Sequence, residues 1–368
     1  MTAEAILPET SAPAQRRDLR GYLLLASMAV GLIPALGFVF SMFWYRGYLG
    51  DWNVFWGIET APLEWVYGHY LPVFPYPPTG LMLFRPFGLL PFWPSLLAWS
   101  AAGATAMAFA SRRMLSRGAL AMGFCTNAMI GVLLGGQTSL FVGALIIGGL
   151  TTQNPRWRGV LLATAAVIKP QSLLAAPIAL IAERNWRAIA WVIATTLTLA
   201  LLSLAAFGLE TWTRWLAELP KFHAWLIDHG IDRRDVGAYG LVRAVGLPGW
   251  LFVIAIPPAL VTSWSVFRTE TPIIDRYAAF ACCTVMMSPY TLSYDLAGLS
   301  LACVAMLMDR KRSPLIWVAA ALILSTIFAN LGIVLMTGML GYEALNRLRA
   351  EKLGVSISDT SSAAVSPR

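Results

Sequence analysis

Long apolar runs separated by short basic clusters dominate the chain. About 20 consecutive apolar residues cross the hydrocarbon core of a membrane as a helix, so these runs predict membrane helices. The runs expected to cross are residues 21–44, 92–111, 118–134, 138–152, 188–207, 249–267, 277–287, 295–308 and 314–346, the last as one helix or as two broken near Asn330. The pattern predicts an all-α polytopic membrane protein with about 10–13 transmembrane or re-entrant helices, several of them short.

Several of these runs are too short for a full span. Residues 118–134 and 138–152 meet at Gly135-Gly136-Gln137, and residues 159–168 and 171–182 meet at Lys169-Pro170-Gln171. We call these two turns the first and the second pivot. Half-length helices are tolerated only where protein or a water-filled cavity surrounds their ends, so both pivots are expected to face a cavity. Residues 79–91, interrupted by Arg85-Pro86, predict a re-entrant or interfacial helix.

The polar segments divide the chain into a membrane domain and two tails. Residues 1–20 predict a cytoplasmic tail, and residues 347–368 predict a disordered cytoplasmic tail. Residues 21–346 form the predicted membrane domain. It has two outer loops, 45–78 and 208–248, and the sequence of the second predicts an amphipathic helix at the membrane interface.

Composition and charge support this topology. Hydrophobic residues make up 58% of the chain, charged residues only 12%, and the mean hydropathy is +0.65. The net charge of +8 comes from clusters between apolar runs, which is the positive-inside pattern of a plasma-membrane protein and not a nucleic-acid-binding surface. The cysteines and histidines lack metal-ligand spacing, so neither a metal nor a cofactor is expected.

Polar residues in separate loops are expected to converge on the extracytoplasmic (periplasmic) face. This topology brings to that face Asp51, Tyr76, Gln137, Lys169, Gln171, Tyr290 and Asp295. Binding sites are typically concave, with a few convergent polar groups. The sequence therefore predicts one polar cavity at this face.

Two of these residues suit particular chemistry. A lysine at membrane depth is costly and marks a site with a partner, so Lys169 is a candidate ligand for a lipid phosphate, with snorkelling to the interface as the alternative. Asp51 is either a solvated loop acid or a base whose pKa its aromatic neighbours Trp52 and Phe55 raise. Asp295 is expected to pair with Arg85 or Lys169, or to bind substrate.

The motifs resemble the DUF2029 group, glycosyltransferase family 87, over about residues 45–300. The resemblance rests on Asp51, Tyr76-Pro77-Pro78, Gly136-Gln137, Lys169-Pro170-Gln171 and Ser288-Pro289-Tyr290 to Tyr294-Asp295. It implies a GT-C-like catalytic domain over residues 21–346 and inverting transfer from a polyprenyl-phosphate sugar. The family's proposed base maps to Asp51, and its other pivots map to Gln137 and Lys169. Mannose is favoured, but Tyr294-Asp295 stands where related mannosyltransferases often carry histidines, so the donor sugar is left open.

One carboxylate is enough for such a transfer, because a lipid phosphate leaves without protonation, unlike the alkoxide of a hydrolase substrate. Lys169 with Arg85 or Arg243 would stabilise the phosphate charge. The sugar would stack on Trp52 or Tyr76, with Asn53, Gln137, Gln171 and Tyr290 as further substrate-binding candidates. The acceptor would be a glycan or glycolipid.

Two other functions fit the same pattern. Broken helices with a charge at membrane depth also occur in transporters, so a flippase for lipid-linked sugars is one alternative. A non-catalytic subunit of an envelope-polysaccharide assembly is the other.

Overall fold

The computed structural model describes residues 18–44, 50–60, 62–67 and 74–353. Throughout these ranges the regular structure is helical, and no strand occurs in them. The all-α prediction is therefore confirmed for the described chain.

In the first part of the chain the apolar runs 21–44 and 92–111 are helical, as predicted, whereas the predicted first outer loop contains two further helices. The elements are α1 (Leu19–Trp44), α2 (Gly50–Thr60), α3 (Leu63–Val66), α4 (Pro78–Phe84), the 3₁₀ helix η1 (Arg85–Leu89) and α5 (Phe92–Ser111). The apolar segment 79–91 is a short helix followed by a 3₁₀ turn, because Pro86 cannot continue the α-helical hydrogen bonding of α4. The break predicted at Arg85-Pro86 is confirmed.

Both predicted pivots separate helices. The next elements are α6 (Arg117–Phe124), α7 (Asn127–Gly135), α8 (Ser139–Thr151), α9 (Pro155–Ile168), η2 (Pro170–Leu173) and α10 (Ala176–Ala182). The single helix expected over 118–134 is wrong, because α6 and α7 meet at a bend of 60°. At the bend the Thr126 hydroxyl lies 2.7 Å from the Gly123 carbonyl and 3.0 Å from the Ser300 hydroxyl. These two hydrogen bonds stabilise the bend in place of a continuous helix.

The second half begins with a long broken helix. Its elements are α11 (Trp186–Asp228), η3 (Ile231–Arg234), α12 (Ala238–Ala244), η4 (Gly249–Ala255), α13 (Ile256–Arg268), α14 (Ile273–Met287), η5 (Ser293–Leu296), α15 (Ala297–Met308), α16 (Pro314–Ser325) and α17 (Ala329–Lys352). Gly208 divides α11 with a positive φ of 77°, at the boundary predicted between the membrane helix and the second outer loop.

The C-terminal apolar segment contains two helices, which settles the choice left open for residues 314–346. Thr326 ends α16 in the left-handed conformation, and α17 begins at Ala329. Residues 347–352 are helical, so the disordered tail expected from residue 347 was placed too early. The segment Arg347 to Lys352 consists mainly of good helix formers, which explains the extension.

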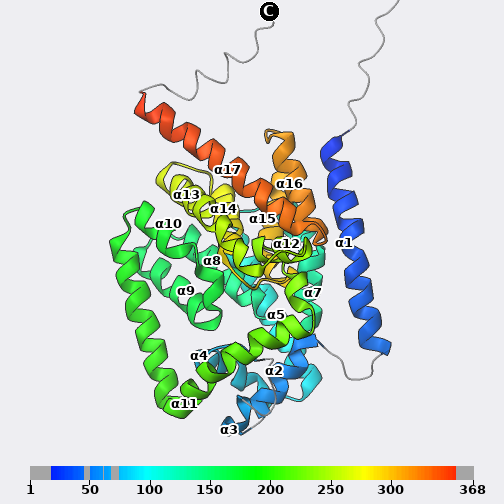
Figure 1. The fold of residues 1–368 in the computed structure, drawn as a ribbon, viewed down its shortest axis with the longest axis vertical. Coiled ribbons are helices and arrows are strands. Elements are labelled where there is room, and N and C mark those ends of the chain that lie inside the picture. Colours follow the sequence, from blue (N-terminus) through cyan, green and yellow to red (C-terminus); the bar gives the residue numbers. More distant parts are fainter. Residues whose placement is uncertain (1–17, 45–49, 61, 68–73, 354–368) are drawn as a thin grey trace, which may run out of the picture.

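Figure 1 shows how the elements are arranged. The first residues of α1 and the last residues of α17 lie at one end of the molecule, and α2, α3 and α4 lie at the other. The first arm of α11 runs along the side of the molecule, and its second arm crosses the end that holds α2 and α4.

The apolar helices indicate a membrane protein, although few of them are long. Two described helical segments, Trp186–Asp228 and Gly249–Arg268, are long and apolar enough to cross a membrane, or three if the bent pair α6–α7 is one span. Shorter apolar helices surround them, as the sequence predicted. Packing between helices satisfies the broken ends of such segments.

Candidate functional site

A cavity of about 430 Å³ lies between segments that are distant in the sequence. Its walls come from α2, from the chain before α4, from the α9–η2 pivot, from the second arm of α11 with η3, and from the loop between α14 and α15. The polar or charged residues that line it are Asp51, Asn53, Tyr76, Lys169, Gln171, Arg234, Tyr290 and Tyr294. Five of the seven residues predicted to converge, Asp51, Tyr76, Lys169, Gln171 and Tyr290, therefore line one cavity, and Gln137 and Asp295 do not.

The residues of α2 that line the cavity are Asp51, Asn53, Val54 and Phe55. Asp51, Val54 and Phe55 stand at i, i+3 and i+4, on one face of the helix, and all three line the cavity. Trp52 is turned about 100° away from Asp51 and is fully buried, 5.2 Å from the Trp99 ring between centroids. The expectation that Trp52 stacks on the sugar is wrong, because this side chain packs in the core.

The packing of Trp52 explains the glycine at the first pivot. Gly136 has a left-handed φ of +68°, and a Cβ built on it would lie 2.6 Å from Cβ of Trp52. Only glycine allows both this backbone conformation and this close approach. The α7–α8 pivot therefore supports α2 directly beside Asp51.

Gly136→Ala is expected to destabilise the protein and to lower its activity. The left-handed backbone costs about 1–2 kcal/mol with a side chain, and overpacking against Trp52 adds about 1–3 kcal/mol. Gly246→Ala is the matched control, because Gly246 has a φ of +77° but no atom within 4 Å of its added methyl. Thermal unfolding of both variants tests this, and an equal loss in the two would show that the Trp52 contact is unimportant.

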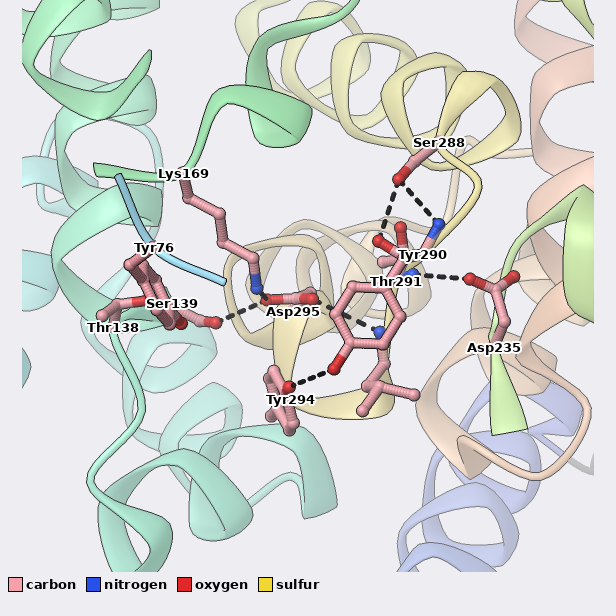
Figure 2. A network of polar contacts seen from close by, with 11 residues as sticks. Tyr76, Thr138, Ser139, Lys169, Asp235, Ser288, Tyr290, Thr291, Tyr294 and Asp295 are labelled. Atoms are coloured by element: carbon pink, nitrogen blue, oxygen red, sulfur yellow. Dashed lines mark hydrogen bonds and ion pairs between the residues drawn. The ribbon is translucent and has the colours of Figure 1, made fainter. Parts of the chain in front are cut away.

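Lys169 and Asp295 form a buried ion pair next to the cavity (Figure 2). Lys169 ends α9 outside the helical region, with φ −141° and ψ 83°, because the following proline disfavours the α conformation, and its side chain turns to the Asp295 carboxylate. Asp295 also accepts hydrogen bonds from the Ser139 hydroxyl at 2.7 Å and from the Leu292 backbone N–H at 3.3 Å. The pairing of Asp295 with Lys169 is thus one of the two alternatives that the sequence suggested.

The Tyr76-Pro77-Pro78 segment is held at both sides. The Tyr76 hydroxyl lies 3.0 Å from the Thr138 hydroxyl, beside the first pivot (Figure 2). The Tyr67 hydroxyl donates to the Tyr76 carbonyl at 2.8 Å, and the Trp215 indole donates to the Pro75 carbonyl at 3.0 Å. These bonds connect α3, the second arm of α11 and the α7–α8 pivot to one wall of the cavity.

Asp235 stabilises the wall of the cavity that contains Tyr290. Its buried carboxylate accepts backbone hydrogen bonds from Gly237, Gly240 and Thr291 at 2.7, 2.9 and 2.5 Å. Figure 2 shows the bond to Thr291, which joins the second outer loop to the loop that carries Tyr290 and Asp295. Asp235 therefore positions the site without lining the cavity, and sequence reasoning missed it because the acids of this loop look alike.

The electrostatic setting of Asp51 suits a base. Burial raises the pKa of Asp51 to about 6, the Lys169 ammonium partly opposes the rise, and the Asp295 carboxylate adds to it. No hydrogen bond or ion pair joins the Asp51 carboxylate to another described residue. Asp51 is thus ionised at neutral pH and available to a ligand.

Only some of the other residues predicted to bind substrate lie at the cavity. Asn53, Gln171 and Tyr290 line the cavity, whereas Gln137 is buried and does not. Gln137 is followed by the two residues that bond into the site, Thr138 and Ser139, so the prediction fell on the wrong member of this turn.

The arginines predicted to bind phosphate are not at the cavity wall. Arg243 pairs with Asp232 at 2.8 Å, and neither Arg243 nor Arg85 lines the cavity. Arg234 does line it, together with the aromatic residues Phe222 and Trp225. Sequence reasoning missed these three; the cluster of Trp and Phe in 208–248 was their signal, but it was interpreted as an interfacial face.

Among the described residues, no group of three or more His, Cys, Asp or Glu side chains could hold a metal ion. The model of one family, glycosyltransferase family 87, matches residues 74–289, more than half of the chain. The matched range contains Tyr76, Lys169 and Arg234, whereas Asp51 and Asp295 lie outside it. No curated protein and no solved structure matches the chain.

Proposed function

The chain belongs to glycosyltransferase family 87 and is a glycosyltransferase, and we propose that it transfers a hexose, with mannose favoured, from a polyprenyl-phosphate donor to an extracytoplasmic glycan or glycolipid. The observation that carries this proposal is the shared cavity of Asp51, Lys169 and Arg234. A carboxylate and two cations around one space are what a base and a phosphate site require.

The reaction is a single displacement at the anomeric carbon. The acceptor hydroxyl forms the new C–O bond, and Asp51 takes its proton. The bond between the anomeric carbon and the donor phosphate oxygen breaks, and polyprenyl phosphate leaves with the bonding electrons. One displacement inverts the configuration, and no second carboxylate is needed, because the phosphate leaves without protonation.

Lys169 and Arg234 supply the positive charge for the leaving phosphate. Asp295 and Ser139 hold the Lys169 chain in place, and the Lys169 ammonium lies 5.2 Å from the Tyr294 ring centroid. Arg234 replaces Arg85 and Arg243 as the second cation, since it alone of the three lines the cavity.

The aromatic wall of the cavity suits a sugar. Tyr76, Phe222, Trp225 and Tyr290 line it, and the Phe222 and Tyr290 rings meet edge to face at 5.5 Å between centroids. With Trp52 buried, these rings are the candidates to stack on the hexose and to shield the reacting centre from water.

The topology supports action outside the cytoplasm of a multi-pass plasma-membrane protein. Arg20 near the start of α1 and Arg349 and Lys352 at the end of α17 lie at the end of the molecule opposite α2. By the positive-inside rule the basic end faces the cytoplasm, so the site near α2 faces outward.

A turnover assay tests the proposal. Purified protein would be incubated with a synthetic polyprenyl-phosphate mannose and a glycolipid acceptor, and released polyprenyl phosphate would be measured. Release that depends on the acceptor supports the proposal. Absence of turnover with polyprenyl-phosphate hexoses, alongside turnover with a nucleotide sugar, would refute the lipid donor.

The pH dependence of this reaction follows from Asp51. The base must be ionised, so kcat/KM is expected to fall as the pH decreases through about 6, the pKa to which burial raises Asp51. An ordinary aspartate would shift this loss to about pH 4. A pH profile between 4 and 8 measures it, and a rate unchanged down to about pH 4.5 would contradict the assigned pKa.

A further inference from the structure

A second polar cavity, of about 650 Å³, lies at the opposite ends of the same helices. The cavity is lined by residues from five helix ends: Leu150, Thr151 and Gln153 at the end of α8, Arg158 near the start of α9, Glu183 to Asn185 after α10, Arg276 near the start of α14, and Arg113 after α5. The turns that follow α5, α8, α10 and α13 thus meet here. Because α9 carries Arg158 near one end and Lys169 at the other, this cavity and the cavity lined by Asp51 are separated by most of that helix.

The second cavity has a surplus of positive charge. Its charged lining residues are Arg113, Arg158, Arg184 and Arg276 against one acid, Glu183. Glu183 pairs with Arg158 through one oxygen and with Arg276 through the other, so one negative charge stands against four positive charges. The Nε atom of Arg158, a residue that is only 7% exposed, has no hydrogen-bond acceptor among the described residues. Such a cavity is built to receive an anion.

An apolar groove of about 530 Å³ continues from this cavity. Arg113 and Thr151 line both spaces, and the groove then follows α5, α8 and α9 past Phe109, Leu161 and Thr164 to Ile168. From Trp157 to Ile168 the helix rises roughly 16 Å at 1.5 Å per residue, close to half of the roughly 30 Å hydrocarbon core. The groove therefore has the depth of one leaflet.

Exposed tryptophans mark the level of the charged end. Trp157, Trp186 and Trp191 are 55%, 62% and 38% exposed, and the Arg156 guanidinium lies 5.0 Å from the Trp191 ring centroid. Tryptophan and arginine collect where a membrane meets water, so the second cavity lies at an interface and the groove extends into the apolar layer.

We propose that this cavity and groove bind one anionic phospholipid of the cytoplasmic leaflet, with its phosphate on the arginines and an acyl chain between α5, α8 and α9. Basic pockets between membrane helices on the cytoplasmic side suit anionic head groups. The charged end of the groove is at Arg112 and Arg113, which places the phosphate there. The other end, at Leu83 and Ile168, is apolar and adjoins the Asp51 cavity, which Ile168 also lines. The bound lipid stabilises α9.

Thermal unfolding in detergent with added lipid tests this proposal without any transfer reaction. Phosphatidylglycerol is expected to raise the Tm of the protein, whereas phosphatidylcholine and inorganic phosphate are not. Equal stabilisation by inorganic phosphate would show an anion site without a lipid, and no stabilisation by phosphatidylglycerol would overturn the proposal. Loss of the phosphatidylglycerol effect when polyprenyl phosphate is added would assign the groove to the donor tail.

Two variants and one control identify the site. Arg113→Gln and Arg184→Gly are each expected to weaken the apparent affinity for phosphatidylglycerol about fivefold. Arg184→Gly keeps the fold, because Arg184 has a left-handed φ of 54° that glycine adopts more easily. Arg117→Gln removes an exposed charge outside the cavity and should leave the affinity unchanged. Equal effects of all three would indicate nonspecific attraction and overturn the proposal.

Discussion

Asp51→Asn is expected to lower kcat by about 10²–10⁴-fold, the usual contribution of a general base. The amide keeps the size of the side chain but cannot take the proton of the acceptor hydroxyl. Donor binding should change little, because the cations Lys169 and Arg234 remain in the cavity. The turnover assay, with KM and kcat measured separately, checks both expectations.

The same variant should not lose stability. Burial raises the pKa of Asp51 to about 6 from 3.8, so the folded protein binds this proton more tightly than the unfolded chain does. The ionised side chain therefore lowers the free energy of unfolding as the pH rises from about 4 through 6. Removing that charge should leave the Tm at pH 7 equal or higher. Asp228→Asn, at an exposed position of α11, is the control, and an Asp51→Asn enzyme with the rate of the control would rule out Asp51 as the base.

Lys169→Met is expected to raise the KM for the donor by roughly 10–150-fold, since hydrogen bonds to charged groups contribute about 1.5–3 kcal/mol. The single variant also leaves the Asp295 carboxylate buried without its ammonium partner. Breaking a buried ion pair on one side costs about 3–5 kcal/mol, so loss of activity alone would not separate binding from folding.

The double variant Lys169→Met with Asp295→Asn separates these effects. It removes both charges, and the new amide oxygen at position 295 can still accept the hydrogen bond from Ser139, which is 2.7 Å long with the native carboxylate. We expect most of the lost stability to return while donor affinity stays low. Lys221→Met, at an exposed lysine on α11, controls for a general loss of charge. Normal donor affinity in the double variant would refute the phosphate role of Lys169.

Local signals in the sequence predicted the elements that carry the site. The pivots at Gly136-Gln137 and Lys169-Pro170 were visible because glycine, proline and polar residues interrupt apolar runs there. The boundary at residue 208 and the possible break near Asn330 were also predicted from the end of an apolar run and a polar residue within one. The bend at Thr126 was missed, since its cause is a hydrogen bond to Ser300, far along the chain.

The orientation of single side chains could not be predicted in this way. Trp52 and Asp51 are neighbours in the sequence, and only the packing of α2 against Trp99 and Gly136 sends one to the core and the other to the cavity. Arg234 and Arg243 lie in the same predicted loop, and the pairing of Arg243 with Asp232 decides which of them reaches the cavity. Which side chains reach the cavity therefore depends on tertiary contacts.

The most direct test of the central claim is a structure of the purified protein with bound polyprenyl phosphate. We expect the phosphate within about 3 Å of the Lys169 ammonium, beside Arg234, with the Asp51 carboxylate facing the side where the hexose would be attached. A phosphate seated in the arginine cavity at the other end of α9, with the Asp51 cavity empty, would contradict it.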